Sequence, residues 1–144
     1  MDFKQALAVD TRTGAPSNVE KSDMVKTIAA LLNTEGGTIL LGVSDAGEIK
    51  GIAPDVAHCT HQNTDGFELK LRQMLDAQLQ PPPHSRIGVS FETFPEGTVC
   101  RVDVPASPGI TYFDNTEVYI RDGNRSSQLT GRNLVEWSAT RNTG

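Results

Sequence analysis

The sequence predicts an α/β (α+β) domain in which a mixed β-sheet with β-hairpins packs against helices, and two observations lead to that expectation. Apolar residues recur at helical spacing in three segments, and short runs that alternate apolar and polar residues lie between them. Clusters of Gly and Pro separate these runs, so the order becomes strand, helix, hairpin, helix, strands, helix. The 144 residues are enough for one domain with its own core.

The chain opens with an expected strand and an expected helix. Residues 3–9 mix apolar and polar side chains, as an opening strand would. Ser17 precedes Glu20 by three residues, which is the spacing of a capping box at a helix start. Apolar residues then recur at helical spacing, so the pattern predicts a helix over residues 19–32.

A pair of glycines separates this helix from an expected hairpin. Gly36 and Gly37 permit a tight left-handed turn, and we expect at least one of them to have a positive φ. Residues 38–43 form an apolar run typical of a strand buried on both faces. Residues 48–52 alternate, so they are expected to return beside that strand as a hairpin.

The second half of the chain predicts further strands between two helices. Its elements are expected in this order: helix 65–79, strands 86–94 and 98–104, a hairpin of 111–113 with 118–120, and helix 133–141. The segment between residues 121 and 127 is expected to be a loop.

Charge and composition limit the possible functions. The net charge is −5, whereas nucleic-acid-binding surfaces are usually basic. From residue 118 onward, however, four arginines outnumber Asp122 and Glu136, so this part carries +2 and residues 1–117 carry −7. Any anion site should therefore be local. No apolar run approaches the roughly 20 residues of a membrane span, and two cysteines cannot form a disulfide framework, so a cytoplasmic location without membrane contact is expected.

One local basic feature follows the strand at residues 118–120. Arg121, Asn124, Arg125 and Ser126 form a polar segment that could hold a phosphate through charge-assisted hydrogen bonds. The alternative is an ordinary solvated loop in which Arg121 pairs with a nearby carboxylate.

No metal site is predicted. His58, Cys59 and His61, with His84 and Cys100 elsewhere, match the spacing of no standard zinc motif.

Three segments together resemble the Schlafen-type Alba-like family. Residues 29–52, AALLNTEGGTILLGVSDAGEIKGI, are similar to its helix ending in Asn-Thr-x-Gly-Gly, its strand ending in Gly-Val, its acidic turn and its return strand. Residues 2–4, DFK, resemble its Glu-Phe-Lys opening, and residues 119–126, YIRDGNRS, resemble its late Tyr-x-Arg-x-Gly-x-x-Ser motif. The matches occur in family order and extend over nearly the whole chain.

The resemblance implies an Alba-like fold and a DNA- or RNA-binding module of a transcriptional regulator. Residues 1–144 would be a single domain that forms the N-terminal part of a longer protein, and it would pair as a homodimer. Lys4, Arg121 and Arg125 would supply positive charge to phosphates, while Asn124 and Ser126 would donate hydrogen bonds. No cofactor is expected for this function.

Two alternatives stay open. The resemblance also implies a metal-dependent endoribonuclease in which Asp2, Lys4 and Asp45 take the family's catalytic positions with Mg²⁺ or Mn²⁺. Asp2 stands where the family has Glu, and the family's preceding Glu has no counterpart in this sequence. The second alternative is a protein-interaction or dimerisation module, which the acidic composition allows.

Overall fold

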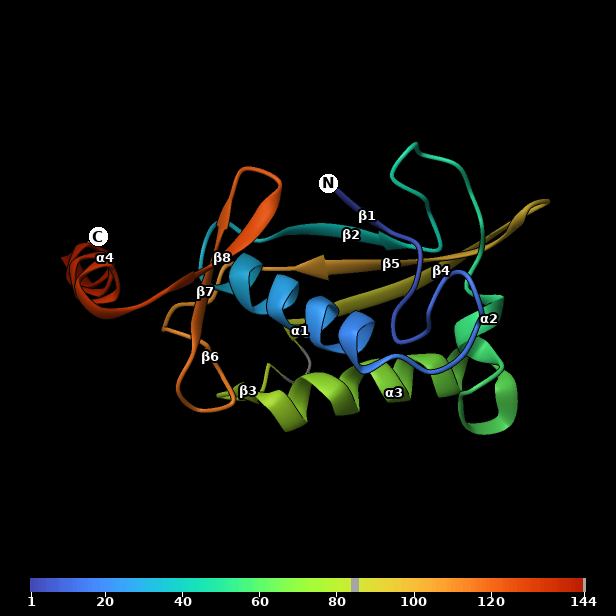
Figure 1. The fold of residues 1–144 in the computed structure, drawn as a ribbon, viewed down its shortest axis with the longest axis horizontal. Coiled ribbons are helices and arrows are strands. Elements are labelled where there is room, and N and C mark those ends of the chain that lie inside the picture. Colours follow the sequence, from blue (N-terminus) through green and yellow to red (C-terminus); the bar gives the residue numbers. More distant parts are fainter. Residues whose placement is uncertain (84–85, 144) are drawn as a thin grey trace.

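The centre of the molecule is a mixed β-sheet with strand order β1-β2-β5-β4 (Figure 1). Its strands are β1 (Asp2–Lys4), β2 (Gly37–Leu41), β5 (Gly97–Val104) and β4 (Gly88–Phe94). β1 runs parallel to β2, and the other two pairings are antiparallel. β1 and β4 are therefore the edge strands of a sheet that is mixed, as the sequence predicts.

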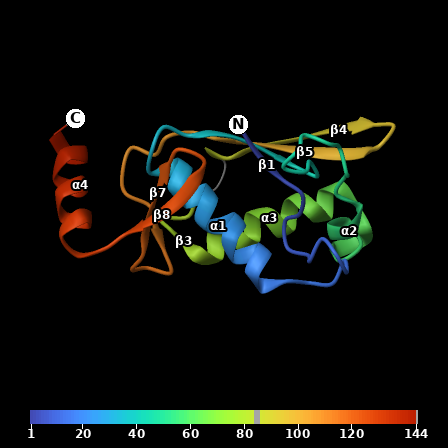
Figure 2. The same ribbon diagram turned by 45° about the horizontal axis from the view of Figure 1, so that its top comes forward.

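Two helices cover one face of this sheet. α1 (Asn18–Leu32) and α3 (Thr64–Gln78) lie side by side on the same side of it (Figures 1 and 2). The core between the layers contains the inward-facing residues of the sheet, namely Ile39, Leu41, Cys100, Val102 and Val104. The opposite face carries Phe3, Leu40 and Arg101, which occupy one row of the strand register.

The two long helices begin and end close to where the sequence predicts. The Ser17 hydroxyl accepts a hydrogen bond from the Glu20 amide at 3.3 Å, so Ser17 caps α1. Asn63 caps α3 in the same way, because its side chain accepts from the amide of Gly66 at 2.8 Å. These bonds satisfy amides that have no partner within the helix.

The computed structural model describes residues 1–83 and 86–143. Its smaller elements are α2 (Ala53–Val56), a 3₁₀ turn (Thr60–Gln62), β3 (Leu79–Gln80), β6 (Tyr112–Phe113), β7 (Val118–Asp122), β8 (Arg125–Leu129) and α4 (Gly131–Thr143). α4 lies apart from the two covering helices, at one end of the molecule (Figure 2). Among the described helices, none combines the length and the apolar character needed to cross a bilayer.

The opening strand is shorter than residues 3–9. β1 ends at Lys4, and the next residues follow an irregular buried path. The carboxylate of Asp55, only 1% exposed, accepts hydrogen bonds from the amides of Leu7 and Ala8, both at 2.8 Å. Because a side chain satisfies these amides, the segment needs no strand partner.

The expected hairpin of residues 38–43 with 48–52 is wrong. β2 already has β1 on one edge and β5 on the other, so no edge remains for a return strand, and only one bridge joins Val43 to Ile49. β2 is also not buried on both faces. Ile39 and Leu41 are buried in the core, whereas Leu40 is half-buried on the opposite face.

The expected hairpin of residues 111–113 with 118–120 forms only at its turn, where one antiparallel bridge joins Phe113 to Glu117 around Asp114 and Asn115. β6 pairs with β3, and β7 pairs with β8. The segment that we expected to be a loop, residues 121–127, is therefore the tip of a hairpin. Gly123, with φ of +63°, and Asn124 form its turn, and a positive φ at the first turn position matches the twist of paired strands.

The expectation for the paired glycines is confirmed at Gly36. Its φ is +73°, and a Cβ atom there would lie 2.4 Å from the carbonyl oxygen of Val104. Gly37 begins β2 without a positive φ, and a Cβ atom there would meet only the Leu31 side chain. Of the two glycines, Gly36 is therefore the one whose backbone conformation requires glycine.

Candidate functional site

A polar hollow of about 340 Å³ lies between the edge strand β1 and the β7–β8 hairpin. Its walls contain every residue that the sequence suggested for phosphate binding or catalysis: Asp2, Lys4, Asp45, Arg121, Asn124, Arg125 and Ser126. Phe3, Asp23 and Thr27 complete the lining. Segments separated by more than a hundred residues in the sequence thus meet at one place.

The pleat of β1 decides which of its side chains enter the hollow. Side chains alternate along a strand, so Asp2 and Lys4 point to one face and Phe3 to the other. The register with β2 places the first two in line with the core residues Ile39 and Leu41, which is the face covered by α1. Asp2 and Lys4 therefore face the helix across the edge of the sheet.

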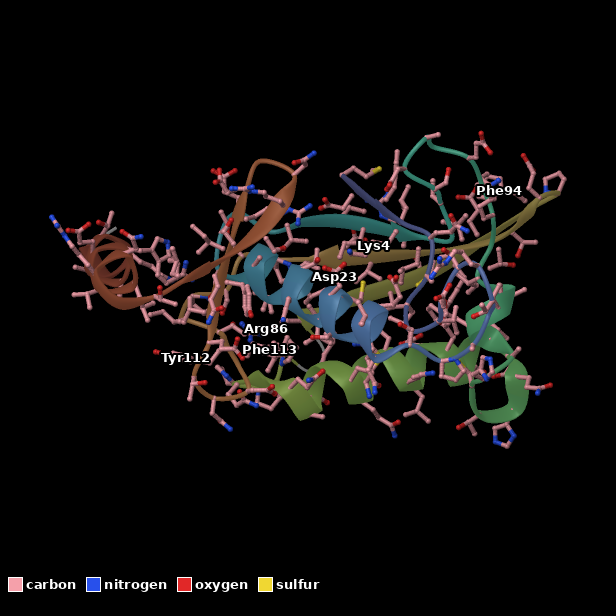
Figure 3. The ribbon with its side chains drawn as sticks, viewed as in Figure 1. Lys4, Asp23, Arg86, Phe94, Tyr112 and Phe113 are labelled. Carbon is pink, nitrogen blue, oxygen red and sulfur yellow. The ribbon has the colours of Figure 1, made fainter. Side chains whose placement is uncertain are left out.

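Lys4 forms an ion pair with α1. Its ammonium nitrogen lies 2.5 Å from the Asp23 carboxylate, and Figure 3 shows the two side chains between β1 and the helix. The Lys4 side chain is 21% exposed and that of Asp23 is 61% exposed. The sequence did not suggest Asp23 or Thr27 as site residues, although the i, i+4 spacing of these two polar residues in a helix was a signal for a shared face.

Arg121 is enclosed by the partners of its own side chain. Its guanidinium forms an ion pair with Asp2 and donates a second hydrogen bond to the Ser126 hydroxyl at 3.0 Å. The Arg121 side chain is 14% exposed and that of Asp2 is 19% exposed. The expected alternative is therefore found in part: Arg121 does pair with a nearby carboxylate, but in a hairpin rather than in a solvated loop. Its role here is to fix the hairpin beside β1.

Arg125 is the accessible cation of the hollow. It is exposed at the start of β8, next to the exposed Asn124, and it forms no ion pair with any residue in the described parts of the chain. A bound anion could therefore reach its guanidinium without breaking an existing pair. Because an arginine presents several donors in one plane, it suits a phosphate particularly well.

Two further hollows extend this one along β1. One, of about 520 Å³, shares Asp2, Arg121 and Asn124 with it and reaches Gly36 and Gly37. Another, of about 240 Å³, shares Phe3, Lys4 and Asp45 with it. We call these three adjoining hollows the β1 trench. It is a long, open, polar surface rather than an enclosed pocket.

The acidic residues of the trench do not fit a catalytic divalent cation. Asp2, Lys4 and Asp45 line one hollow, but the Arg121 guanidinium already pairs with one carboxylate oxygen of Asp2, so Lys4 and Arg121 place positive charge beside the acids. Across residues 1–83 and 86–143, no three His, Cys, Asp or Glu side chains group closely enough to hold a metal. Mg²⁺ and Mn²⁺ take several oxygen ligands, which this arrangement does not supply.

His58 and Cys59 each have a structural partner. His58 bonds a backbone carbonyl oxygen, and the Cys59 thiol donates to the carbonyl oxygen of Asp55 at 3.1 Å. Burial raises the pKa of Cys100 to about 12. His84 lies outside the described residues.

Asn33 fixes the base of the hairpin from within the core. It is 1% exposed, and its side chain donates to the carbonyl oxygen of Thr111 and accepts from the amide of Thr111. It also donates to the carbonyl oxygen of Tyr119, the second residue of β7. Burial, followed by the hydrogen bond from the phenol to Glu117, raises the pKa of Tyr119 to about 12. Asn33 therefore supports the site without belonging to its surface.

The chain is similar to a known protein family and to a solved structure. A sequence profile of the family described as "Schlafen, AlbA_2" matches residues 1–130, which ends just after β8 and leaves α4 outside. A solved structure, the DIP2311 protein from Corynebacterium diphtheriae, aligns with 94% of the chain at 22% sequence identity and a TM-score of 0.64. The chain covers 22% of that protein, so the likeness concerns one part of a longer protein and its fold alone.

Proposed function

The chain belongs to the Schlafen, AlbA_2 family, and from that premise we propose that it is a nucleic-acid-binding module of a regulatory protein, whose β1 trench holds backbone phosphates. Arg125 makes the principal charged contact. Asn124 donates a neutral hydrogen bond beside it, and Lys4, Arg121 and Ser126 set the shape and polarity of the trench.

One observation carries this proposal. Arg125 is exposed within a hollow whose other cations, Lys4 and Arg121, are each paired with a carboxylate. In those two residues a carboxylate already offsets the positive charge that would attract a phosphate. The charge of Arg125 is not offset in this way, so of the three cations it attracts an anion most strongly.

The acidity of the domain predicts weak, salt-sensitive binding. The net charge of −5 repels a polyanion at long range, and few phosphates can be neutralised at once. Each neutralised phosphate of a single strand adds about −0.7 to the slope of log affinity against log salt concentration. With Arg125 as the charged contact, one neutralised phosphate predicts a slope of about −0.7.

Fluorescence anisotropy with labelled single-stranded DNA, single-stranded RNA and duplex DNA tests the proposal. At about 50 mM salt we expect Arg125→Ala to weaken binding about tenfold and to make the salt slope shallower by about 0.7. Arg132→Ala is the matched control, since it removes the same charge from an exposed side chain of α4. Equal losses in the two variants would mean that only net charge matters and that the trench is not the site.

Two other readings are tested in the same samples. Degradation of labelled RNA in Mg²⁺ or Mn²⁺, lost in Asp45→Asn, would favour the nuclease. Absence of binding at any salt concentration would favour a protein-interaction module. The homodimer and the cytoplasmic location stay predictions, and light scattering at high protein concentration tests the first.

A further inference from the structure

We infer that the open face of the sheet is a base-binding platform, so that the trench and this face together take single-stranded nucleic acid. The inference rests on the proposed function and adds a second surface to it. Phosphates would follow the β1 trench, and bases would turn over β1 onto the strands beyond.

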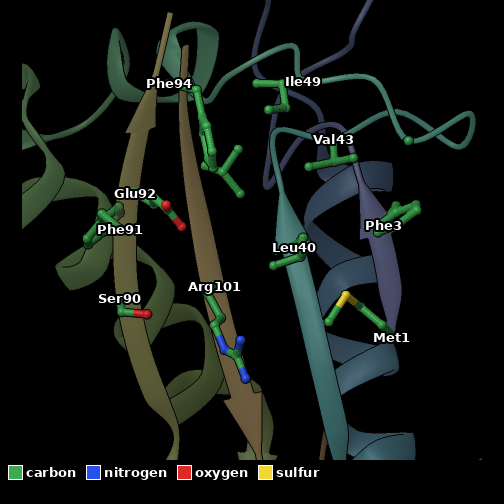
Figure 4. Close-up of a pocket in the computed structure, with 12 residues that line it drawn as sticks. Met1, Phe3, Leu40, Val43, Ile49, Ser90, Phe91, Glu92, Phe94 and Arg101 are labelled. Carbon is green, nitrogen blue, oxygen red and sulfur yellow. The ribbon is translucent and has the colours of Figure 1, made fainter. Parts of the chain in front are cut away.

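The open face of the sheet contains an apolar groove of about 430 Å³ (Figure 4). Phe3 and Phe94 contribute aromatic rings to it, and Leu40 and Val43 line it between them. No described helix covers this face, since α1 and α3 lie on the other side of the sheet (Figure 2). Apolar side chains on this face are thus exposed to water, and an exposed apolar patch is typical of an interaction site.

The strand register arranges this groove across the whole sheet. Phe3, Leu40 and Arg101 occupy one row, and the row continues to Ser90 on β4. Three strand spacings of about 4.8 Å give a platform about 14 Å wide. Four-stranded sheets of this width that expose aromatic residues can stack two or three unpaired bases.

Phe3 connects the groove to the trench. Phe3 lines the apolar groove and two hollows of the trench, and it is 38% exposed. Its neighbours Asp2 and Lys4 point into the trench, because side chains alternate along β1. A nucleotide whose phosphate lies beside Lys4 can therefore place its base over Phe3.

The charges on this face favour the binding of neutral bases rather than of phosphates. Arg101 is the groove's cation, and its side chain is 53% exposed while its Nε atom bonds Asp103 at 3.1 Å. Glu92 lines the same groove and would repel a phosphate. Neutral bases avoid that repulsion and can stack on the rings and on the guanidinium plane. Stacking also adds affinity to the few phosphate contacts that a domain of net charge −5 can make.

An oligonucleotide without bases separates the two surfaces. We expect an abasic strand of equal length to bind at least tenfold more weakly than the ordinary strand, because stacking is lost while the phosphates remain. Phe3→Ala and Phe94→Ala should each weaken binding of the ordinary strand about tenfold and leave the abasic strand unchanged. Leu69→Ala, an exposed apolar residue of α3, is the matched control and should change neither.

The outcomes distinguish this inference from the proposed function. Equal binding of ordinary and abasic strands, with Arg125→Ala weakening both, would overturn the platform and keep the phosphate trench. Equal binding of single strands and duplex would also overturn it, because duplex bases are not free to stack. A dimer that Phe3→Ala converts to a monomer would assign the face to a second copy of the chain. If no oligonucleotide binds, both ideas fail.

Discussion

The corner formed by Asn33 to Gly37 and the hairpin that carries Arg125 both match the family's sequence signatures, yet they differ in what they leave available. The Asn33 residue is 1% exposed, and its side chain forms hydrogen bonds with backbone groups. Arg125 is exposed and forms no ion pair within the described residues. A residue of the family signature can therefore stabilise the fold or bind a ligand. Which of the two it does depends on whether its polar atoms are already engaged within the protein.

Two hydrogen bonds join the corner to β7, and the first runs from the Asn33 side chain to the carbonyl oxygen of Tyr119 at 3.0 Å. In the second, the hydroxyl of Thr34 accepts from the backbone amide of Arg121 at 2.9 Å. The corner therefore fixes the position of β7 relative to α1, and β7 in turn fixes the position of the hairpin tip. Substitutions in the corner should lower stability, whereas substitutions at the tip should lower binding.

The largest effect is expected at Gly36. Gly36→Val places a branched side chain at a φ of +73°, with its Cβ atom 2.4 Å from the carbonyl oxygen of Val104. We expect a loss of at least about 4 kcal/mol in the free energy of unfolding, or no folded protein. Urea denaturation measures it. Gly37→Ala is the control and should cost much less, since its nearest contact is the flexible Leu31 side chain at 3.2 Å. Equal losses of unfolding free energy in the two variants would mean that the backbone of Gly36 is not the strained position.

Asn33→Ala should have the next largest effect. It leaves the amide and carbonyl of Thr111 and the carbonyl of Tyr119 without their buried partner. Because these buried polar groups would lack hydrogen-bond partners, we expect the free energy of unfolding to fall by about 3 kcal/mol. Thermal unfolding measures the loss, and binding by the remaining folded protein should be unchanged. A binding defect that exceeds the unfolded fraction would make the corner part of the ligand surface.

The smallest stability effects, and the sharpest contrast, are expected within the hairpin. Arg121→Ala leaves the carboxylate of Asp2 unpaired at 19% exposure, which predicts a loss of about 1–2 kcal/mol. Arg125→Ala should change stability by less than about 0.5 kcal/mol, because its side chain is exposed. Denaturation and anisotropy on the same samples test both. If Arg125→Ala destabilises the protein as much as Arg121→Ala, the division between structural and binding arginines is wrong.

Local patterns predicted the helices well. Ser17 and Glu20 marked the start of α1, and helical spacing marked the buried face of α3. These features depend on neighbours within a few residues, which the sequence displays directly. The alternation of β5 was equally readable, since Cys100 and Val102 are buried and Arg101 is exposed.

Strand pairing was predicted poorly because it depends on which edges are free. Residues 48–52 alternate as a strand does, but β1 and β5 already occupy both edges of β2. Val118 to Ile120 was expected to pair backward and instead pairs forward with β8. Alternation shows that a segment can be a strand without identifying its partner.

The sequence by itself determined the residue types of the site, the helices that support it and the need for a glycine at the corner. Only the tertiary structure decided that Lys4 and Arg121 are engaged with Asp23 and Asp2 while Arg125 is accessible. The sequence does not identify the partners of Lys4 and Arg121, because these two ion pairs join residues 19 and 119 positions apart. Their pairing follows from how the chain packs, and that packing determines which cation can meet a ligand.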